Sequence, residues 1–199
     1  MREMIKDYVG DGRRYEHTLS VESECAVLAD RYGLSCEDKL RLAYAALLHD
    51  ITKKLTPDEQ KELYRHFGLD FDDAAAHSYK TLHAVTGSAL AREKFPEVAD
   101  EAVCSAVRWH TTARPRMTML EKLLYLADYI EPTRTFDDCV KLRKLYYDST
   151  ENDRSAEALD RIIYISLKMT VENLLSEDKY IHRDTIEALN YYLPENGGR

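Results

Sequence analysis

The chain has 199 residues, of which 32% are charged, and a formal net charge of -8. This length fits one globular domain with a real core, and the acidic balance argues against nucleic-acid binding through a general basic surface. The longest apolar runs are far shorter than a bilayer span, and the charged residues 1–7 do not resemble a signal peptide. We therefore expect a cytoplasmic protein that contacts neither membranes nor nucleic acid.

Helix signals recur along the chain, whereas strand signals do not. Gly33 fits a helix C-terminus, and Ser35 fits an N-cap that is followed by two acidic residues. Thr56 and Thr118 each open a capping box, and Pro132 should end the helix that follows Thr118. The pattern predicts helices over residues 12–32, 36–49, 57–67, 79–95, 97–111, 119–130, 136–147, 153–175 and 182–192.

We interpret residues 1–199 as a single all-α domain. Its core spans about residues 10–175 and is followed by a C-terminal helix over residues 182–192 and a frayed tail. The stretch 69–76 is acidic and then alanine-rich, and we expect it to be the loop nearest the functional site. The four cysteines are scattered, which fits reduced thiols in helices better than a disulfide framework.

The adjacent pair His49 and Asp50 follows the apolar run over residues 43–48. Both side chains can ligate a metal ion, and at the end of a buried helix they are poor packing residues. An unpaired buried polar or charged group is costly, so both need partners once they leave water. A metal ion is the partner that suits both.

Four further potential ligands lie in comparable settings: His17, His83, His110 and Asp128. Each lies on an apolar helix face or at a helix end. Taken alone, His17 and His83 fit partly buried core histidines better than ligands. Asp128 is harder to explain in that way, because a carboxylate amid so much apolar surface is rare without a partner.

The combination of these residues favours two metal ions over one, because six ligands exceed the four of a tetrahedral zinc site. Mixed imidazole and carboxylate ligands suit iron, manganese or zinc. Asp50 can bridge two ions with its two oxygens, and paired ions would activate water and bind a phosphoryl group. The remaining histidines have polar or acidic neighbours, and of these only His77 stays open as a residue near the site.

Several segments resemble a known family. The order of His17, then His49 with Asp50, then Asp128 is similar to the H…HD…D pattern of the HD-domain metal-dependent phosphohydrolases. His83 and His110 match members that hold two metals. The segments at residues 14–17, 47–53, 110–112 and 127–134 resemble the YqeK family, and the similarity spans about residues 10–170. The HD dipeptide is a weak signal, but ADYIEP-x-R after HD-x-x-K and HTT is a strong one.

This resemblance implies an HD-domain helical bundle with a di-iron centre, in an enzyme that cuts diadenosine tetraphosphate symmetrically into two ADP. By position it implies one metal held by His17, His49, Asp50 and Asp128, and a second held by Asp50, His83 and His110. Manganese and zinc tolerate the same ligands. The catalytic residues would then be Asp50, Lys53 and Arg134, with Lys53, Arg134 and Thr111 binding the substrate phosphates.

Two residues depart from the family pattern. Ala113 stands where a glycine usually follows HTT, and Thr118 stands where a serine usually follows the methionine. These departures put the loop geometry in question but not the metal site. Arg114 and Arg116 follow His110, and we interpret them as surface charges, whereas Lys53 and Arg134 are interpreted as functional cations.

The expected ligand is a dinucleoside polyphosphate or a nucleoside diphosphate, and the protein could be a monomer or a homodimer. One alternative is an HD-type phosphohydrolase of a nucleoside monophosphate, a cyclic nucleotide or guanosine tetraphosphate. A second is a nucleotide-binding regulatory module that has lost catalysis, although no expected ligand is missing. A third is a helical interaction protein with buried histidines, whose tyrosines would serve an interface.

Overall fold

The computed structural model describes residues 1–194, and these residues form helices and connecting turns without a β-strand. The predicted all-α fold class is therefore confirmed. The expected frayed tail falls mostly on residues 195–199, which lie outside the described part of the chain. The helices are α1 (Arg2–Val9), α2 (Arg13–Arg31), α3 (Cys36–Leu48), α4 (Pro57–His66), α5 (Asp73–His77), α6 (Leu82–Lys94), α7 (Glu101–Trp109), α8 (Met119–Ile130), α9 (Asp137–Ser149), α10 (Ala156–Ser176) and α11 (Arg183–Tyr191).

Side-chain caps set several helix N-termini where the sequence predicts them. At α8, the Thr118 hydroxyl accepts a hydrogen bond from the N–H of Glu121, whose carboxylate accepts the N–H of Thr118 in return. Thr56 and Glu59 form the same reciprocal pair at α4, and Ser35 caps α3. Each cap satisfies N–H groups that have no partner within the helix.

Two predicted helices are shorter than expected. The helix predicted over 97–111 begins only at α7, because the Asp100 carboxylate accepts the N–H of Val103 and caps the helix there. The helix predicted over 79–95 is preceded by a 3₁₀ turn at residues 79–81 and becomes α-helical at Leu82. In both places the helix-like spacing of apolar residues continues on the N-terminal side of the first α-helical residue.

Two short helices were not predicted. α1 occupies the N-terminus and ends at Gly10, which has a φ of 82° that favours glycine. α5 occupies part of the stretch 69–76 that we expected to be a loop, and that expectation is wrong for the alanines. The Asp72 carboxylate caps α5 by accepting the N–H of Ala75, and alanine is the strongest helix former.

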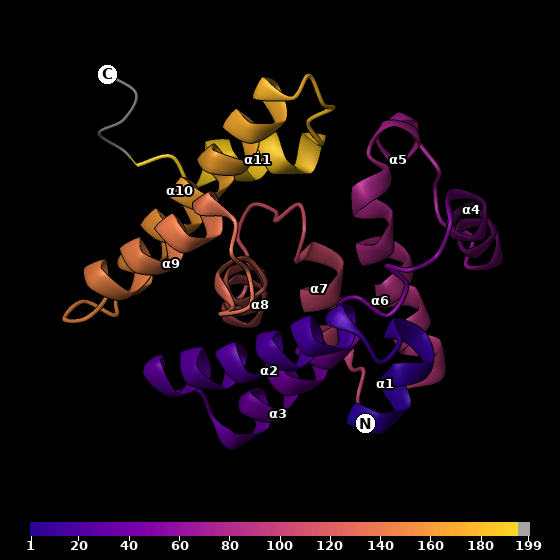
Figure 1. Cartoon of the computed structure of the whole chain (residues 1–199), viewed down its shortest axis with the longest axis horizontal. Helices are drawn as coiled ribbons and strands as arrows, with labels where there is room; N and C mark the ends of the chain where they lie inside the picture. The colour runs from indigo at the N-terminus through magenta and orange to yellow at the C-terminus, as the bar shows by residue number, and fades with distance from the viewer. Residues whose placement is uncertain (195–199) are drawn as a thin grey trace.

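Helix α8 is the central element of the fold (Figure 1). It packs against α2, α3, α7 and α9, and its apolar residues are buried on nearly every side. Leu123, Leu124, Leu126 and Ile130 are fully buried, and burying one such side chain stabilises a protein by roughly 1.5–3 kcal/mol. Asp128 belongs to the same helix, so the core also holds this carboxylate in place.

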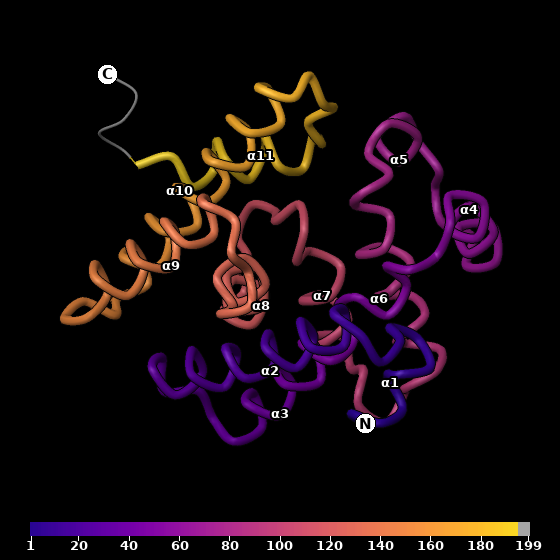
Figure 2. The backbone as a smooth tube through the Cα atoms, in the orientation of Figure 1, coloured from indigo at the N-terminus to yellow at the C-terminus, as the bar shows by residue number. Residues whose placement is uncertain are grey.

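The remaining helices lie on two sides of α8. Figure 2 shows α9, α10 and α11 as one group and α4, α5 and α6 as another, with α2 and α3 packed side by side beneath α8. None of the helices within residues 1–194 is both long enough and apolar enough to cross a membrane.

We predict that Thr118→Ala lowers the free energy of unfolding by about 1 kcal/mol, because one helix N–H loses its side-chain acceptor. Urea denaturation followed by circular dichroism measures the change. Thr118→Ser keeps the hydroxyl and serves as the control, with stability close to that of the parent. An unchanged midpoint for Thr118→Ala would show that the cap contributes nothing to α8.

Candidate metal centre

Segments far apart in the sequence bring the six expected ligands into one cluster. α2 carries His17, α6 carries His83 and α8 carries Asp128. His49 and Asp50 lie in the turn after α3, and His110 directly follows α7. Three overlapping groups each have one ligand atom per residue within 4.8 Å of the others: His17, His49 and Asp50; His49, His110 and Asp128; and Asp50, His83 and His110.

The two carboxylate oxygens of Asp50 face different histidines. Oδ1 lies 3.1 Å from Nε2 of His83 and 3.7 Å from Nε2 of His110. Oδ2 lies 3.6 Å from Nε2 of His49 and 4.0 Å from Nε2 of His17. The carboxylate thus lies between two pairs of imidazoles, which is the position that a group bridging two cations would take.

Asp128 completes one side of the cluster. Its Oδ1 lies 3.0 Å from Nε2 of His17 and 3.8 Å from Nε2 of His49. The same oxygen accepts a hydrogen bond of 2.7 Å from Nη2 of Arg134. One oxygen therefore faces two imidazoles and a guanidinium group.

Backbone carbonyls determine the tautomers of two buried histidines. Nδ1 of His49 lies 2.6 Å from the carbonyl oxygen of Ala46, and Nδ1 of His110 lies 2.7 Å from that of Val107. A carbonyl oxygen can only accept, so Nδ1 carries the proton in both rings. In the neutral rings, the lone pair is then on Nε2, and both Nε2 atoms face the cluster.

Nε2 of His49 provides the test of whether this cluster fits a metal. This atom is buried and has no hydrogen-bond partner among the described residues. Leaving such a lone pair unsatisfied costs about 1–3 kcal/mol, and a cation among the neighbouring carboxylates would satisfy it. The imidazole and carboxylate donors are therefore compatible with divalent metal binding.

Burial and nearby charges set the protonation of the cluster. Burial lowers the pKa of His49 and of His83 to about 4, so both rings are neutral at neutral pH and can donate a lone pair. Burial opposes the charge of Asp50, but the Lys53 ammonium lies 3.2 Å from its Oδ1 and helps to hold the pKa of Asp50 well below its usual value. Arg134 has the same effect on the pKa of Asp128.

Glu131 is a site residue to which the sequence analysis assigned no role. It is fully buried, and its Oε1 lies 2.9 Å from Nδ1 of His17. Burial opposes a charge on His17, but hydrogen bonds to Asp128 and Glu131 outweigh it and raise the pKa of His17 to about 9. A carboxylate on Nδ1 orients the ring so that Nε2 faces the cluster. Its position three residues after Asp128 is the signal that could have identified it.

A buried polar network holds the turn that carries His49 and Asp50. The Thr52 hydroxyl donates to the carbonyl of His83 at 2.9 Å and lies 2.9 Å from the Thr86 hydroxyl. Gln60 donates to the carbonyl of Thr52 at 2.7 Å and accepts from Thr86 at 2.6 Å. The network joins the turn to α4 and α6, and no local sequence pattern indicated it.

Lys53, Arg134 and Thr111 were expected to bind substrate, and all three lie beside the cluster. Nζ of Lys53 lies 3.2 Å from Oδ1 of Asp50 and 3.2 Å from Nε2 of His83. Arg134 contacts Asp128, while its Nε is buried without a hydrogen-bond partner among the described residues. The Thr111 hydroxyl is also buried and unpartnered there.

Arg143 holds the loop that contains Arg134, although the sequence analysis did not single it out. Its guanidinium donates to the carbonyls of Ile130, Glu131 and Arg134 at 2.5, 2.6 and 2.8 Å. These contacts satisfy carbonyls at the C-terminus of α8. Arg143 is therefore a positioning residue for Glu131 and Arg134.

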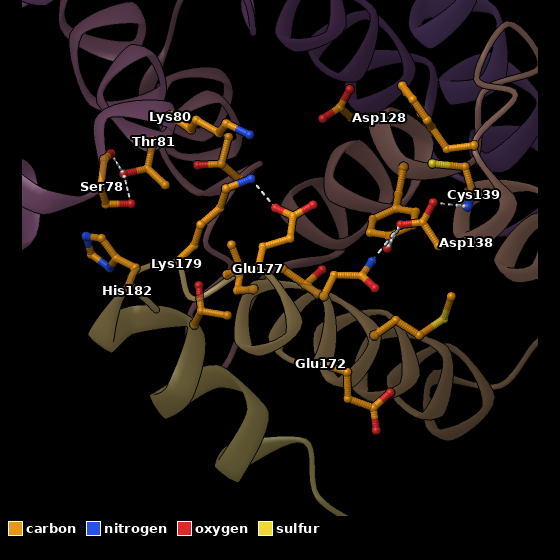
Figure 3. Close-up of a pocket in the computed structure, with 18 of the residues that line it drawn as sticks. Ser78, Lys80, Thr81, Asp128, Asp138, Cys139, Glu172, Glu177, Lys179 and His182 are labelled. Carbon is orange, nitrogen blue, oxygen red and sulfur yellow. Dashed lines mark hydrogen bonds and ion pairs between the residues drawn. The ribbon is translucent and has the colours of Figure 1, made fainter.

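A wide pocket opens beside the cluster, and Figure 3 shows part of its lining. His110, Thr111, Asp128 and Arg134 line it, and so does His77, which lies outside the three ligand groups. Arg114 and Arg116 do not line this pocket.

Arg114 and Arg116 were expected to be surface charges, and only Arg116 fits this expectation. Arg116 is exposed, whereas Arg114 donates to the fully buried carboxylate of Glu121 at 2.8 Å. Ala113 and Arg116 have positive φ values of 57° and 55°. The departure from glycine at Ala113 is therefore accommodated in a left-handed backbone conformation.

Comparison with known proteins agrees with this geometry. The family model described as the HD domain matches residues 14–133. A symmetrical bis(5'-nucleosyl)-tetraphosphatase of Halalkalibacterium halodurans is 34% identical over 97% of this chain and 95% of its own. An enzyme with the same name from Staphylococcus aureus is 32% identical over 90% of this chain and 87% of its own.

A solved structure shares the whole fold. The crystal structure of a predicted HD superfamily hydrolase from Clostridium acetobutylicum, described as involved in NAD metabolism, has a TM-score of 0.82 and 32% sequence identity. It matches 96% of this chain and 94% of its own. The chain belongs to the HD-domain family and, within it, to the family of the symmetrical bis(5'-nucleosyl)-tetraphosphatases.

Proposed function

We propose that this protein is a metal-dependent hydrolase that cleaves diadenosine tetraphosphate symmetrically into two ADP. The observation that carries the proposal is the buried cluster of four imidazoles and two carboxylates, in which Nε2 of His49 has no hydrogen-bond partner from residues 1–194. The names of the relatives support a dinucleoside tetraphosphate rather than a nucleoside monophosphate, a cyclic nucleotide or guanosine tetraphosphate. The complete ligand set argues against a catalytically silent module.

We infer that the cluster holds two metal ions. His17, His49, Asp50 and Asp128 would hold one, while Asp50, His83 and His110 would hold the other. The two carboxylate oxygens of Asp50 face different histidines, and this supports a bridging role for Asp50. Iron is the metal that we propose, and manganese and zinc fit the same donors. When bound, the ions supply Lewis-acid activation of the phosphoryl group and of water.

The cationic side chains would hold the polyphosphate beside the cluster. The Arg134 side chain is partly exposed and lines the pocket, so it can contact phosphate oxygens while it still pairs with Asp128. Lys53 provides a point charge beside Asp50, and the Thr111 hydroxyl can donate a hydrogen bond to an oxygen of the polyphosphate. These contacts would orient the scissile anhydride and offset the charge on the departing ADP.

Other expectations stay predictions. They are the single-domain organisation, the cytoplasmic location and the choice between monomer and homodimer. None of them bears on the chemistry of the cluster.

The proposed function is tested by product analysis on diadenosine tetraphosphate, using protein loaded with iron, manganese or zinc under anaerobic conditions. We expect ADP as the sole product, and loss of turnover on chelation that is restored by adding metal back. A panel containing AMP, a cyclic nucleotide and guanosine tetraphosphate is run in parallel. Release of AMP and ATP from diadenosine tetraphosphate, or preference for another nucleotide, would refute symmetrical cleavage.

We predict that His49→Ala and Asp50→Ala each lower the hydrolysis rate by at least about a hundredfold, because each removes a metal ligand. Bound metal, measured by plasma mass spectrometry, should fall in both variants, while the helical circular dichroism spectrum is kept. His66→Ala is the matched control, because His66 is exposed and pairs with Glu93 on the surface. Full activity in either ligand variant would disprove the site.

We predict that Arg134→Ala raises the KM for diadenosine tetraphosphate by roughly tenfold or more, because a charge-assisted phosphate contact is lost. Metal content is measured alongside, since Arg134 also contacts Asp128. Arg116→Ala provides the control, because Arg116 is exposed and outside the pocket. An unchanged KM in Arg134→Ala would exclude phosphate binding by this residue.

A further inference from the structure

The pocket beside the metal centre is large and is lined from two sides. Its volume is about 1330 Å³, above the roughly 300–1,000 Å³ of ordinary small-molecule sites. One side is formed by residues 77–81 together with residues 179–185, and the other by residues 134–141. Figure 3 shows Ser78 and His182 at one end of the lining and Asp138 and Cys139 at the other. The pocket therefore has room for an extended ligand with two ends.

Phe136 provides an aromatic surface at one end. Its side chain is 67% exposed, the largest value among the exposed large hydrophobic residues of the described chain. It lines the pocket two residues after Arg134 and has no aromatic partner within residues 1–194. A phenylalanine at this position contributes little to the core, so its exposed ring is free to contact a ligand.

Tyr180 provides a second aromatic surface at the other end. It is 41% exposed and lies nearly parallel to His77, with ring centroids 5.5 Å apart and an interplanar angle of 25°. Both residues line the pocket. Because His77 packs against one face of the Tyr180 ring, the pair presents a preorganised aromatic surface.

The pocket lining is mixed in charge, because Lys80, Lys141 and Lys179 line it as well as acidic residues. Arg134 lies beside Asp128 of the cluster, whereas Asp137 and Asp138 follow Phe136 in the pocket lining. Asp138 accepts hydrogen bonds from Tyr129 at 2.9 Å and from Asn173 at 3.0 Å, and these contacts hold its carboxylate in place two residues after Phe136. Carboxylates repel phosphate but suit an uncharged base that carries amino groups.

We propose that Phe136 and the Tyr180–His77 pair are two nucleobase-stacking surfaces, one for each nucleoside of a substrate whose polyphosphate lies at the metal centre. This inference rests on the proposed function and specifies which residues recognise the two bases. Stacking on an aromatic ring is largely independent of base identity, because every base has a π-face. The two surfaces therefore select for a nucleoside at each end of the polyphosphate rather than for one particular base.

The test compares ligands with and without bases in Phe136→Ala, Tyr180→Ala and the double variant. Each single substitution should raise the KM for diadenosine tetraphosphate by roughly tenfold, with kcat within about twofold, because one stacked base is lost. The effects should multiply in the double variant. The inhibition constant of inorganic tetraphosphate, which has no base, should not change.

Two further variants serve as controls for the loss of the aromatic rings. Phe136→Trp keeps an aromatic surface and should retain the parental KM. Tyr191→Ala removes a tyrosine that is 49% exposed but does not line the pocket, and it should also leave the KM unchanged. A parental KM in both alanine variants, or an equal loss of tetraphosphate binding, would overturn the proposal.

Binding of ADP and of pyrophosphate, measured by calorimetry on the metal-loaded protein, separates the two proposals. The double variant should bind ADP more weakly and pyrophosphate equally well, whatever the parent protein hydrolyses. If the parent fails to produce ADP from diadenosine tetraphosphate but this difference in binding remains, the proposed function fails and the stacking surfaces stand. If ADP binding is unchanged in the double variant, the stacking surfaces fail.

Discussion

The buried lone pair on Nε2 of His49 is the constraint on which the site depends. The carbonyl of Ala46 holds the ring proton on Nδ1, so Nε2 faces the cluster with a lone pair for which the described part of the chain offers no donor. Burial keeps the ring neutral by lowering its pKa to about 4. A cation would satisfy a neutral imidazole in this setting, and the carboxylates of Asp50 and Asp128 favour the same cation. The cluster is thus costly to bury without a metal and stabilised with one.

Hydrogen bonds from residues that are not expected ligands account for the well-defined positions of the side chains in the cluster. Glu131 orients His17, and the network of Thr52, Thr86 and Gln60 holds the turn after α3. Arg143 donates to two carbonyls at the end of α8 and to that of Arg134, and so holds the loop between α8 and α9. These groups are not ligands themselves, but they limit the positions that the ligating atoms can adopt.

The arrangement would also let an acidic chain bind the proposed polyanionic substrate. The net charge of -8 is spread over the whole sequence, whereas Lys53 contacts Asp50 of the cluster and Arg134 contacts Asp128 where the cluster meets the pocket. Bound cations would further invert the local field. Asp137 and Asp138 directly follow Phe136 in the pocket lining, so one of the two proposed base positions has carboxylates close to it in the sequence.

The sequence by itself determined the helix caps at Thr56 and Thr118, the all-α class and the identity of all six clustered residues. Those signals are local: apolar periodicity, capping chemistry, and polar groups on apolar faces that need partners. Only the tertiary structure decided that Asp50 faces two pairs of histidines, that Glu131 contacts His17, and that Phe136 and Tyr180 share one pocket. Such contacts join residues from different helices, and packing around α8 determines them, so a local pattern can single out Glu131 by its spacing from Asp128 but cannot indicate which residue it contacts.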